Sequence, residues 1–200
     1  MKKLPRAFYS RSALHVAKDL LGKILVRKIG RTTLLGRIVE VEAYLGAKDP
    51  ASHTYRGKTK RNEVMFWGGG HLYVYFTYGM HFCCNVVTEG KGVGHAVLIR
   101  AVEPMAGIEV MKRNRERLRK NQGSTILCSG PARLCQAFGI GRAQNGADLC
   151  GKEIWIAIDP NSMERPRISK STRIGITNGK QHNWRFFLTR NTFVSRGRPV

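Results

Sequence analysis

Three short runs of apolar or alternating residues constrain the fold of this chain more than any other sequence feature. These runs are residues 71–78, 82–88 and 95–102. Gly79 separates the first two, and a segment with three glycines between residues 90 and 94 separates the last two. Connections this short join antiparallel strands, because parallel strands need a crossover of a dozen or more residues. The sequence therefore predicts an antiparallel sheet in the middle of the chain.

More strands are predicted before and after this sheet. Short apolar or alternating runs occur at residues 23–27, 34–45 and 153–158, and residues 184–194 can form one or two more strands. Residues 10–22 instead repeat apolar side chains at helical spacing. Ser10 or Ser12 can cap the start of this helix, and Gly22 suits its C-terminal end.

Two further helices are predicted in the second half of the chain. One runs from Pro104 to about Lys120, because proline is tolerated in the first turn of a helix. A shorter one starts near Pro131 and ends at Gly139. Strands and helices do not alternate regularly, so we predict an α+β fold in which α-helices flank a curved antiparallel β-sheet. We expect residues 1–200 to form a single domain.

The charge of the chain points to a polyanionic partner. Its 200 residues include 35 Lys and Arg against 13 Asp and Glu, which gives a net charge of +22. A hydrophobic content of 42% with 24% charged residues is typical of a folded protein and excludes disorder as the main state. Neutralised phosphates release condensed counterions, so nucleic acid is the favoured partner and an acidic membrane surface the second.

Sequence patterns also bear on location and cofactors. No apolar run approaches the roughly 20 residues needed to cross a bilayer, and the basic start lacks an apolar stretch. We therefore expect no membrane association and an intracellular protein, in the cytoplasm or nucleoid of a bacterium or the nucleus of a eukaryote. The five cysteines form no CxxC pair and are predicted to be reduced, mostly buried thiols. Zinc-site spacings and a Walker A loop are missing, so we predict no metal and no cofactor, although a Schiff-base lysine stays open.

Two carboxylates in residues 37–46 need an explanation on a chain so short of acids. Regular alternation places one set of side chains on one strand face, namely Ile38, Glu40, Glu42 and Tyr44, opposite Val39, Val41, Ala43 and Leu45. A carboxylate near phosphates is electrostatically unfavourable, so its presence calls for a functional reason. One such reason is general-base catalysis, in which the carboxylate activates a water for attack on a glycosidic carbon. The alternative is an ion pair with Arg37 or another arginine on an exposed face.

Tyrosines follow in the next strand. Alternation places Tyr73 and Tyr75 on one face with His71, opposite an apolar face. Tyrosines of a basic protein can stack on extruded bases or wedge into a duplex, and each stacked base contributes roughly 1–3 kcal/mol. The alternative is an aromatic stripe that belongs to the core. The role of His53 is also left open by the sequence. It can be a surface residue, a capping residue or a functional one.

Five ordered motifs together resemble the alkyladenine (3-methyladenine) DNA glycosylase family. They are residues 39–46, residues 72–80 leading to Asn85, and residues 97–104, 128–135 and 173–175. The resemblance covers the chain from Leu4 to Ser195. It implies a monofunctional base-excision enzyme that flips a damaged purine out of duplex DNA and hydrolyses its N-glycosidic bond with water. It implies neither a metal nor a lyase step.

The resemblance also implies roles for individual residues. Glu42 matches the general base that activates the water, and Arg100 matches the arginine that helps to hold Glu42 and the water. Tyr44, His53 and Tyr75 match the pocket that sandwiches the flipped base.

Other matched positions concern selectivity and contact with DNA. Asn85 matches a pocket residue that disfavours guanine through its exocyclic amine. Tyr78 matches the side chain that fills the gap left in the minor groove, with Met80 beside it. Three positions depart from the family pattern, since Val41 replaces a common threonine, His81 a common tyrosine and Cys84 a common methionine. Histidine titrates near neutral pH, so His81 bears on DNA contact and on which lesions are preferred.

Two other functions stay open on the residues alone. One is a non-catalytic nucleic-acid-binding module, in which the glutamates pair with arginines and the tyrosines stack on single strands. The other is a glycosidase for free nucleosides, which the charge argues against because a small neutral substrate gains little from a basic surface. With the resemblance included, we expect a monomer that acts on double-stranded DNA containing damaged purines such as 3-methyladenine, 7-methylguanine or hypoxanthine.

Overall fold

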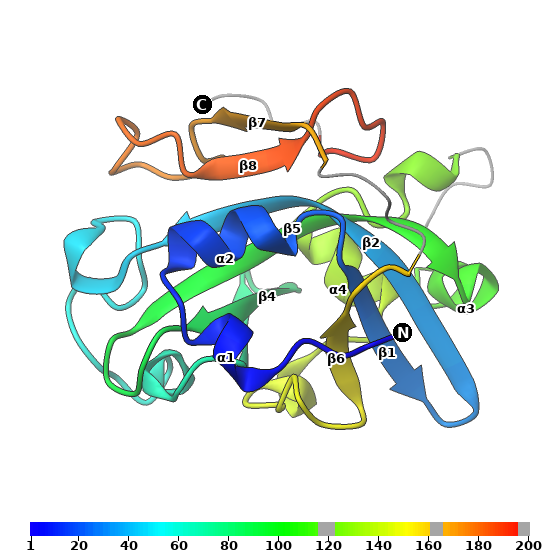
Figure 1. The fold of residues 1–200 in the computed structure, drawn as a ribbon, viewed down its shortest axis with the longest axis horizontal. Coiled ribbons are helices and arrows are strands. Elements are labelled where there is room, and N and C mark those ends of the chain that lie inside the picture. The colour runs from blue at the N-terminus through cyan, green and yellow to red at the C-terminus, as the bar shows by residue number, and fades with distance from the viewer. Residues whose placement is uncertain (116–122, 161–165, 196–200) are drawn as a thin grey trace.

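A curved antiparallel sheet runs through the protein, with helices packed against it (Figure 1). The computed structural model describes residues 1–115, 123–160 and 166–195. The strands are β1 (Ile24–Ile29), β2 (Thr32–Tyr44), β3 (Leu72–Thr77), β4 (His81–Thr88), β5 (His95–Ala106), β6 (Ile154–Ala157), β7 (Ile168–Ser171) and β8 (Arg185–Leu188). The α-helices are α1 (Arg6–Tyr9), α2 (Ala13–Leu20), α3 (Ile108–Arg113) and α4 (Pro131–Ala137). The predicted α+β fold is confirmed.

Short 3-10 helices lie in the connections between these elements. They are η1 (Gly46–Lys48), η2 (Glu63–Phe66), η3 (Ser124–Ile126) and η4 (Arg142–Gln144). None of the helices in the described ranges combines the length and the apolar character needed to span a bilayer.

The long strand β2 organises the sheet, whose strand order is β3-β4-β5-β2-β1-β6. One edge of β2 pairs with β5. The other edge pairs first with β1, and then, over residues 40–42, with β8. Strand β7 pairs with the outer edge of β8. Residues near the end of the described chain therefore lie beside the C-terminal part of β2.

The three predicted hairpin strands are confirmed as β3, β4 and β5, each antiparallel to the next. The helix predicted over residues 10–22 is observed as α2, and the one predicted from Pro131 is observed as α4. Apart from the 3-10 helices, two elements were not predicted. These are the short helix α1 and the strand β7, whose few residues are too short a window for a periodic pattern.

The predicted helix start at Pro104 is wrong. Strand β5 continues through Pro104, which lies opposite Gly36 beside a shift in the β2–β5 register. A proline within a sheet is tolerated at such an irregularity, because it has no N–H to donate there. The helix begins only after Gly107, which has a φ of 75°, and α3 ends at Arg113. The predicted helix end near Lys120 lies outside the described residues.

Two bulges change which side chains of β2 share a face. The β2–β5 register shifts twice between Ile38 and Val41, so Val39 on β2 and Arg100 on β5 have no directly paired residue. The prediction that Ile38 lies on the face of the glutamates is therefore wrong. Ile38 packs in the main core cluster, which also holds Val41 and Ala43 as predicted. An extra residue reverses the alternation, and bulges of this kind often redirect side chains beside active sites.

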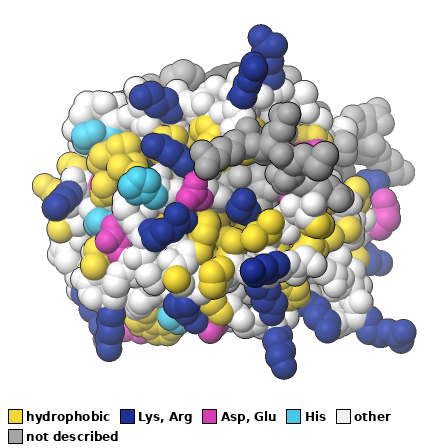
Figure 2. All heavy atoms as spheres, viewed as in Figure 1, with side chains coloured by type: hydrophobic (Ala, Val, Ile, Leu, Met, Phe, Trp, Pro, Cys, Tyr) yellow, Lys and Arg dark blue, Asp and Glu magenta, His cyan; other side chains and the backbone are white. Residues whose placement is uncertain are grey.

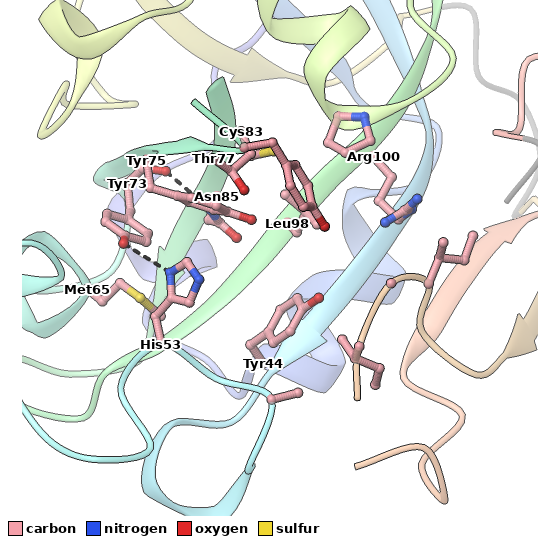
Figure 3. Close-up of a pocket in the computed structure, with 16 residues that line it drawn as sticks. Tyr44, His53, Met65, Tyr73, Tyr75, Thr77, Cys83, Asn85, Leu98 and Arg100 are labelled. Atoms are coloured by element: carbon pink, nitrogen blue, oxygen red, sulfur yellow. Dashed lines mark hydrogen bonds between the residues drawn. The ribbon is translucent and has the colours of Figure 1, made fainter. Parts of the chain in front are cut away.

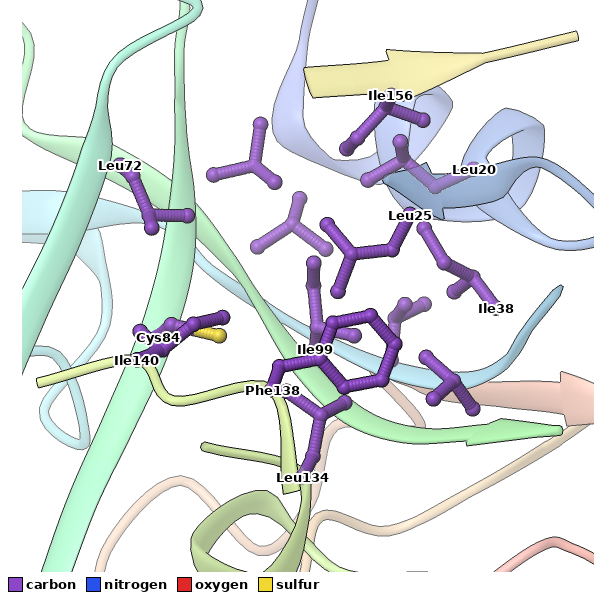
Figure 4. Close-up of a cluster of buried hydrophobic side chains, with 14 of the residues drawn as sticks. Leu20, Leu25, Ile38, Leu72, Cys84, Ile99, Leu134, Phe138, Ile140 and Ile156 are labelled. Atoms are coloured by element: carbon purple, nitrogen blue, oxygen red, sulfur yellow. The ribbon is translucent and has the colours of Figure 1, made fainter. Parts of the chain in front are cut away.

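One hydrophobic cluster joins the sheet to the helices (Figure 4). Leu20 of α2 and Leu134 of α4 are both fully buried in it, together with Leu25 and Ile99 of the sheet. All five cysteines are free thiols, and all but Cys150 are buried, so this prediction is confirmed. The cluster provides a rigid support for the residues on the other faces of the strands.

Candidate active site

A pocket of about 360 Å³ lies at one end of the sheet, beside β2, β3, β4 and β5 (Figure 3). Its walls combine aromatic, apolar and a few polar side chains, which is the usual composition of a small-molecule site. The lining includes six of the eight residues to which the resemblance assigns a role, namely Tyr44, His53, Tyr75, Tyr78, Asn85 and Arg100. The structure thus brings these six residues together, although they span 57 positions of the chain from Tyr44 to Arg100.

Cross-strand pairing builds one wall of the pocket. Tyr73 lies directly opposite Asn85, and Tyr75 directly opposite Cys83, so these four side chains share one face of the β3–β4 hairpin. The rings of Tyr73 and Tyr75 stack with centroids 5.6 Å apart. The side-chain amide of Asn85 donates to the Tyr73 carbonyl at 3.3 Å, which fixes its orientation. Burial raises the pKa of the Cys83 thiol to about 11, so it is protonated at neutral pH.

His53 reaches the same wall from a loop. Its ring contacts Tyr75 edge to face at 4.4 Å between centroids, and its Nδ1 lies 3.1 Å from the Tyr73 hydroxyl. The side-chain amide of Asn62 donates to the His53 carbonyl at 2.8 Å and so anchors the loop. Burial, and to a lesser degree Arg61, lower the pKa of His53 below its ordinary value. The ring is therefore neutral at pH 7.

A pH titration checks this environment of His53. Its lowered pKa means that the unfolded chain takes up the proton at a higher pH than the folded protein does. The stability that comes from the neutral ring is therefore present above about pH 6.5 and is lost as the pH falls below that value. We expect an NMR titration of the His53 ring to give a midpoint below about 6.5. A midpoint at or above that value in the folded protein would contradict the burial seen here.

Tyr44 faces this wall from β2. Figure 3 shows its ring on one side of the pocket, with His53 and Tyr75 across from it. Its hydroxyl donates to Glu42 Oε2 at 2.8 Å. Burial, and then the charge of Glu42, raise the pKa of the Tyr44 hydroxyl well above its ordinary value, so it stays a donor. A flat ring between these aromatic groups would be stacked from both sides.

Glu42 lies directly behind the pocket wall. Its side chain is fully buried and does not itself line the pocket, but the three residues that contact it do. The Ile174 amide donates to Glu42 Oε1 at 2.8 Å, and Arg100 Nη1 lies 3.2 Å from the same oxygen. With the Tyr44 hydroxyl on Oε2, three donors hold the carboxylate in one orientation. A carboxylate held in this way is placed for proton transfer at the pocket wall.

Arg100 links Glu42 to the second carboxylate. Its Nε donates to Glu40 Oε1 at 3.0 Å while Nη1 contacts Glu42. Burial opposes the charge of the guanidinium, but Glu42 and Glu40 outweigh it and raise the pKa of Arg100 above its ordinary value. The guanidinium is therefore a fixed positive charge between the two carboxylates.

Glu40 is the buried anchor of this network. Arg185 Nε donates to it at 2.7 Å, and the Ser195 amide and hydroxyl donate at 2.7 and 2.9 Å. The ion-pair alternative is therefore observed for Glu40. Glu40 is fully buried and its partners Arg100 and Arg185 are largely buried, so these ion pairs do not lie on an exposed face. Arg37 takes no part in it, since it pairs with Glu103 and Asp159.

The hairpin turn between β3 and β4 forms the rim of the pocket. Tyr78 is 82% exposed and Met80 is 68% exposed, so both project from the protein. Tyr78 and Gly79 have φ angles of 50° and 66°, and the Met80 amide donates to the Thr77 carbonyl. A left-handed conformation is costly for a bulky residue and often marks a functional site.

Several residues of the site were given no role from the sequence, although Arg173 and Ile174 lie in one of the motifs that carry the resemblance. The Ile174 amide is a main-chain group, so residue type alone cannot reveal it. Arg173 and Asp49 form a buried ion pair close to Tyr44 but lie 124 positions apart in the chain. Cys83 was recognised only as a cysteine, although its place opposite Tyr75 follows from the hairpin register.

Comparisons with known proteins agree with this arrangement. The family described as methylpurine-DNA glycosylase matches residues 7–192. A relative from Burkholderia orbicola (strain MC0-3) is 51% identical over 98% of this chain and 92% of its own length. A relative from Carboxydothermus hydrogenoformans is 51% identical over 96% of this chain and 98% of its own length. A relative from Chlorobium luteolum is 46% identical over the full length of both chains.

Each of these relatives bears the name "putative 3-methyladenine DNA glycosylase". The family match spans nearly all of the described structure, including every residue around the pocket named above except Ser195. The sequence motifs, the aromatic pocket and these matches lead to the same assignment. The chain belongs to the methylpurine-DNA glycosylase family, a family of enzymes that hydrolyse N-glycosyl bonds.

Proposed function

We propose that this protein removes damaged purines from double-stranded DNA by hydrolysing the N-glycosidic bond with water, which leaves an abasic site. The observation that carries the proposal is a buried carboxylate, Glu42, held by three donors directly behind the wall of an aromatic pocket. The substrates are methylated and deaminated purines, including 3-methyladenine, the base named for the relatives.

The pocket accepts a purine that has been flipped out of the duplex. Tyr44 stacks on one side of the base, while His53 and Tyr75 contact the other. An enzyme that acts on a base must extrude it, at a cost of a few kcal/mol that is smallest for a weakened pair. Asn85 lies on the pocket face with its amide fixed by the Tyr73 carbonyl, and we assign it the task of disfavouring the exocyclic amine of guanine.

Hydrolysis requires a water that loses a proton as it attacks the sugar carbon. Glu42 accepts that proton, and Arg100 helps to hold both Glu42 and the water. The transition state resembles an oxocarbenium ion, which the negative charge of Glu42 also stabilises. Every group that we assign to this chemistry belongs to the protein or to water.

The exposed hairpin turn and the basic surface contact the DNA duplex. Tyr78 fills the gap left by the flipped nucleotide, with Met80 beside it in the minor groove. Lys and Arg side chains are spread over the face seen in Figure 2, where they can contact phosphates. We propose that the protein acts as a single-domain monomer, which can slide along DNA.

A substitution of Tyr78 can separate the contribution of its side chain to DNA binding from the cost of its left-handed backbone conformation. We expect Tyr78→Asn to stabilise the fold by up to about 1 kcal/mol, because asparagine adopts a left-handed conformation more readily than tyrosine does. The loss of the aromatic side chain should lower the preference for damaged over undamaged duplex about tenfold, since one stacked ring contributes roughly 1–3 kcal/mol. Thermal melting and equilibrium binding to both duplexes measure the two effects.

Arg190→Asn is the matched control for Tyr78→Asn, because Arg190 also has a positive φ, of 60°, but does not line the pocket. It should stabilise the fold to a similar extent and leave the preference for damaged duplex unchanged. If Tyr78→Asn kept the native preference for damaged over undamaged duplex, Tyr78 would not be the residue that fills the gap left by the flipped nucleotide.

A single-turnover assay tests the proposed function itself. Duplexes that contain 3-methyladenine, 7-methylguanine or hypoxanthine are incubated with excess protein, and free base and abasic sites are quantified. Release of free base in equal amount to abasic sites supports the proposal. Salt-sensitive binding without release from any of the three lesions would instead indicate a binding module that lacks the chemistry.

A further inference from the structure

A buried arginine covers the back of the pocket's main stacking ring. The Arg173 guanidinium lies over the ring of Tyr44, 4.7 Å from its centroid. It also lies over the ring of Trp184, 5.0 Å from the centroid, and Trp184 stacks on His182 with centroids 3.9 Å apart. Arg173 does not line the pocket, whereas Tyr44 does. One face of Tyr44 is therefore occupied by the protein's own cation, which leaves only the opposite face for a stacked base.

The position of this cation is fixed. Asp49 accepts two hydrogen bonds from Arg173, at 2.5 and 2.8 Å, and both side chains are fully buried. Arg173 also donates to the Ala43 carbonyl at 3.0 Å. Asp49 in turn accepts from the amides of Leu45 and Ala51, so the pair ties together the segments on both sides of Tyr44. The guanidinium cannot move away when a base enters the pocket.

The charge behind the ring affects which bases stack well in front of it. An aromatic ring attracts a cation through the negative potential of its faces. A guanidinium on one face reduces that attraction on the other, and it also repels a second cation directly through a medium of low dielectric constant. Asp49 offsets part of this repulsion because its carboxylate lies beside Arg173.

We propose that the Arg173–Asp49 pair is a specificity determinant that sets how the pocket responds to the charge of the lesion. This inference rests on the proposed function and deepens it. Because the pair reduces the advantage of a cationic base, the enzyme binds neutral lesions such as hypoxanthine as readily as cationic methylated purines of similar shape. Removal of either partner shifts this balance, and the two removals shift it in opposite directions.

The test compares two bases that differ in charge but hardly in shape. One duplex carries 7-methylguanine, which is cationic, and the other carries 7-deaza-7-methylguanine, which is neutral. Equilibrium binding is measured in Glu42→Gln proteins, so that the base stays attached during the experiment. The measured quantity is the ratio of the two dissociation constants within one preparation, in which the fraction of folded protein and the effect of the guanine amine cancel.

Two substitutions give expected shifts of opposite sign. Arg173→Gln leaves the Asp49 charge without its partner and should shift the ratio roughly three- to tenfold towards the cationic base. Asp49→Asn leaves the Arg173 charge without its partner and should shift the ratio towards the neutral base by a similar factor. A purely structural role would weaken binding of both bases alike, or shift both variants in the same direction. Either variant tests the proposal if the other fails to fold.

Arg11→Gln and Asp19→Asn are the matched controls. These residues form an ion pair of 2.8 Å on the surface, away from the pocket lining, and their substitution changes the net charge by the same amounts. Their ratios should stay at the native value. Unchanged ratios for both Arg173→Gln and Asp49→Asn, with both duplexes still bound, would overturn the inference. Failure of the proposed function is a separate outcome, seen as no base release by the native protein.

Discussion

Replacing Glu42 by glutamine is expected to lower the single-turnover rate of base release by a factor of about 10²–10⁴ and to leave DNA binding nearly unchanged. Glutamine has the shape of glutamate but cannot take a proton from water. Its carbonyl oxygen can still accept from the Ile174 amide and from Arg100, as Glu42 Oε1 does. The amide group can then meet the Tyr44 hydroxyl, which is able to accept as well as donate. The pocket should therefore keep its shape while the chemistry is lost.

Glu109→Gln provides the matched control for this experiment. Its side chain is 82% exposed on α3, and the substitution removes one negative charge, as Glu42→Gln does. Its rate should equal that of the native protein. Native rates for Glu42→Gln, with the control behaving as expected, would show that another group activates the water.

Glu40→Gln is expected to lower the free energy of unfolding by about 3–5 kcal/mol, which is the usual cost of removing one partner from a buried ion pair. All the contacts of Glu40 come from donors, namely Arg100, Arg185 and both the amide and the hydroxyl of Ser195. A glutamine would turn its own N–H groups towards at least one of these donors. It would also leave the Arg185 charge without its carboxylate. Chemical denaturation followed by fluorescence measures the loss.

Asp19→Asn gives the comparison for Glu40→Gln. Asp19 pairs with Arg11 on the surface, where both side chains are more than 40% exposed, so its loss should change stability by about 1 kcal/mol or less. If Glu40→Gln were no more destabilising than Asp19→Asn, the buried network around Glu40 would contribute little to the fold.

Local patterns were enough to predict the hairpins and much of the pocket wall. Alternation along β3 placed Tyr73 and Tyr75 together, and the short turn at Gly79 made β4 the partner of β3. The observed register then adds Asn85 and Cys83 to the same face, because directly opposed residues of antiparallel strands point the same way. The resemblance to a known family supplied the roles, which the residue pattern alone left open.

Other features depend on contacts that a local pattern does not contain. The bulges at Val39 and Arg100 arise from the fit between two long strands, so alternation assigned Ile38 to the wrong face. Pro104 has the same sequence signal at a helix start and at an irregular strand end. The Arg173–Asp49 pair joins segments 124 positions apart, so the motif at residues 173–175 does not show which carboxylate Arg173 contacts.

The pairing of β8 with β2 also bears on how the protein comes to be active during its synthesis. Glu40 is held by Ser195, 155 positions further along the chain, so the carboxylate network closes only after almost all of the described chain has left the ribosome. Contacts of such long sequence separation form late and slowly, since they need closure of a large loop. A nascent chain can already form the β3–β4 hairpin, but it still lacks the contacts of Arg185 and Ser195 with Glu40 of β2. The enzyme is therefore expected to gain its excision activity in one late step, after the β3–β4 wall of the pocket has formed.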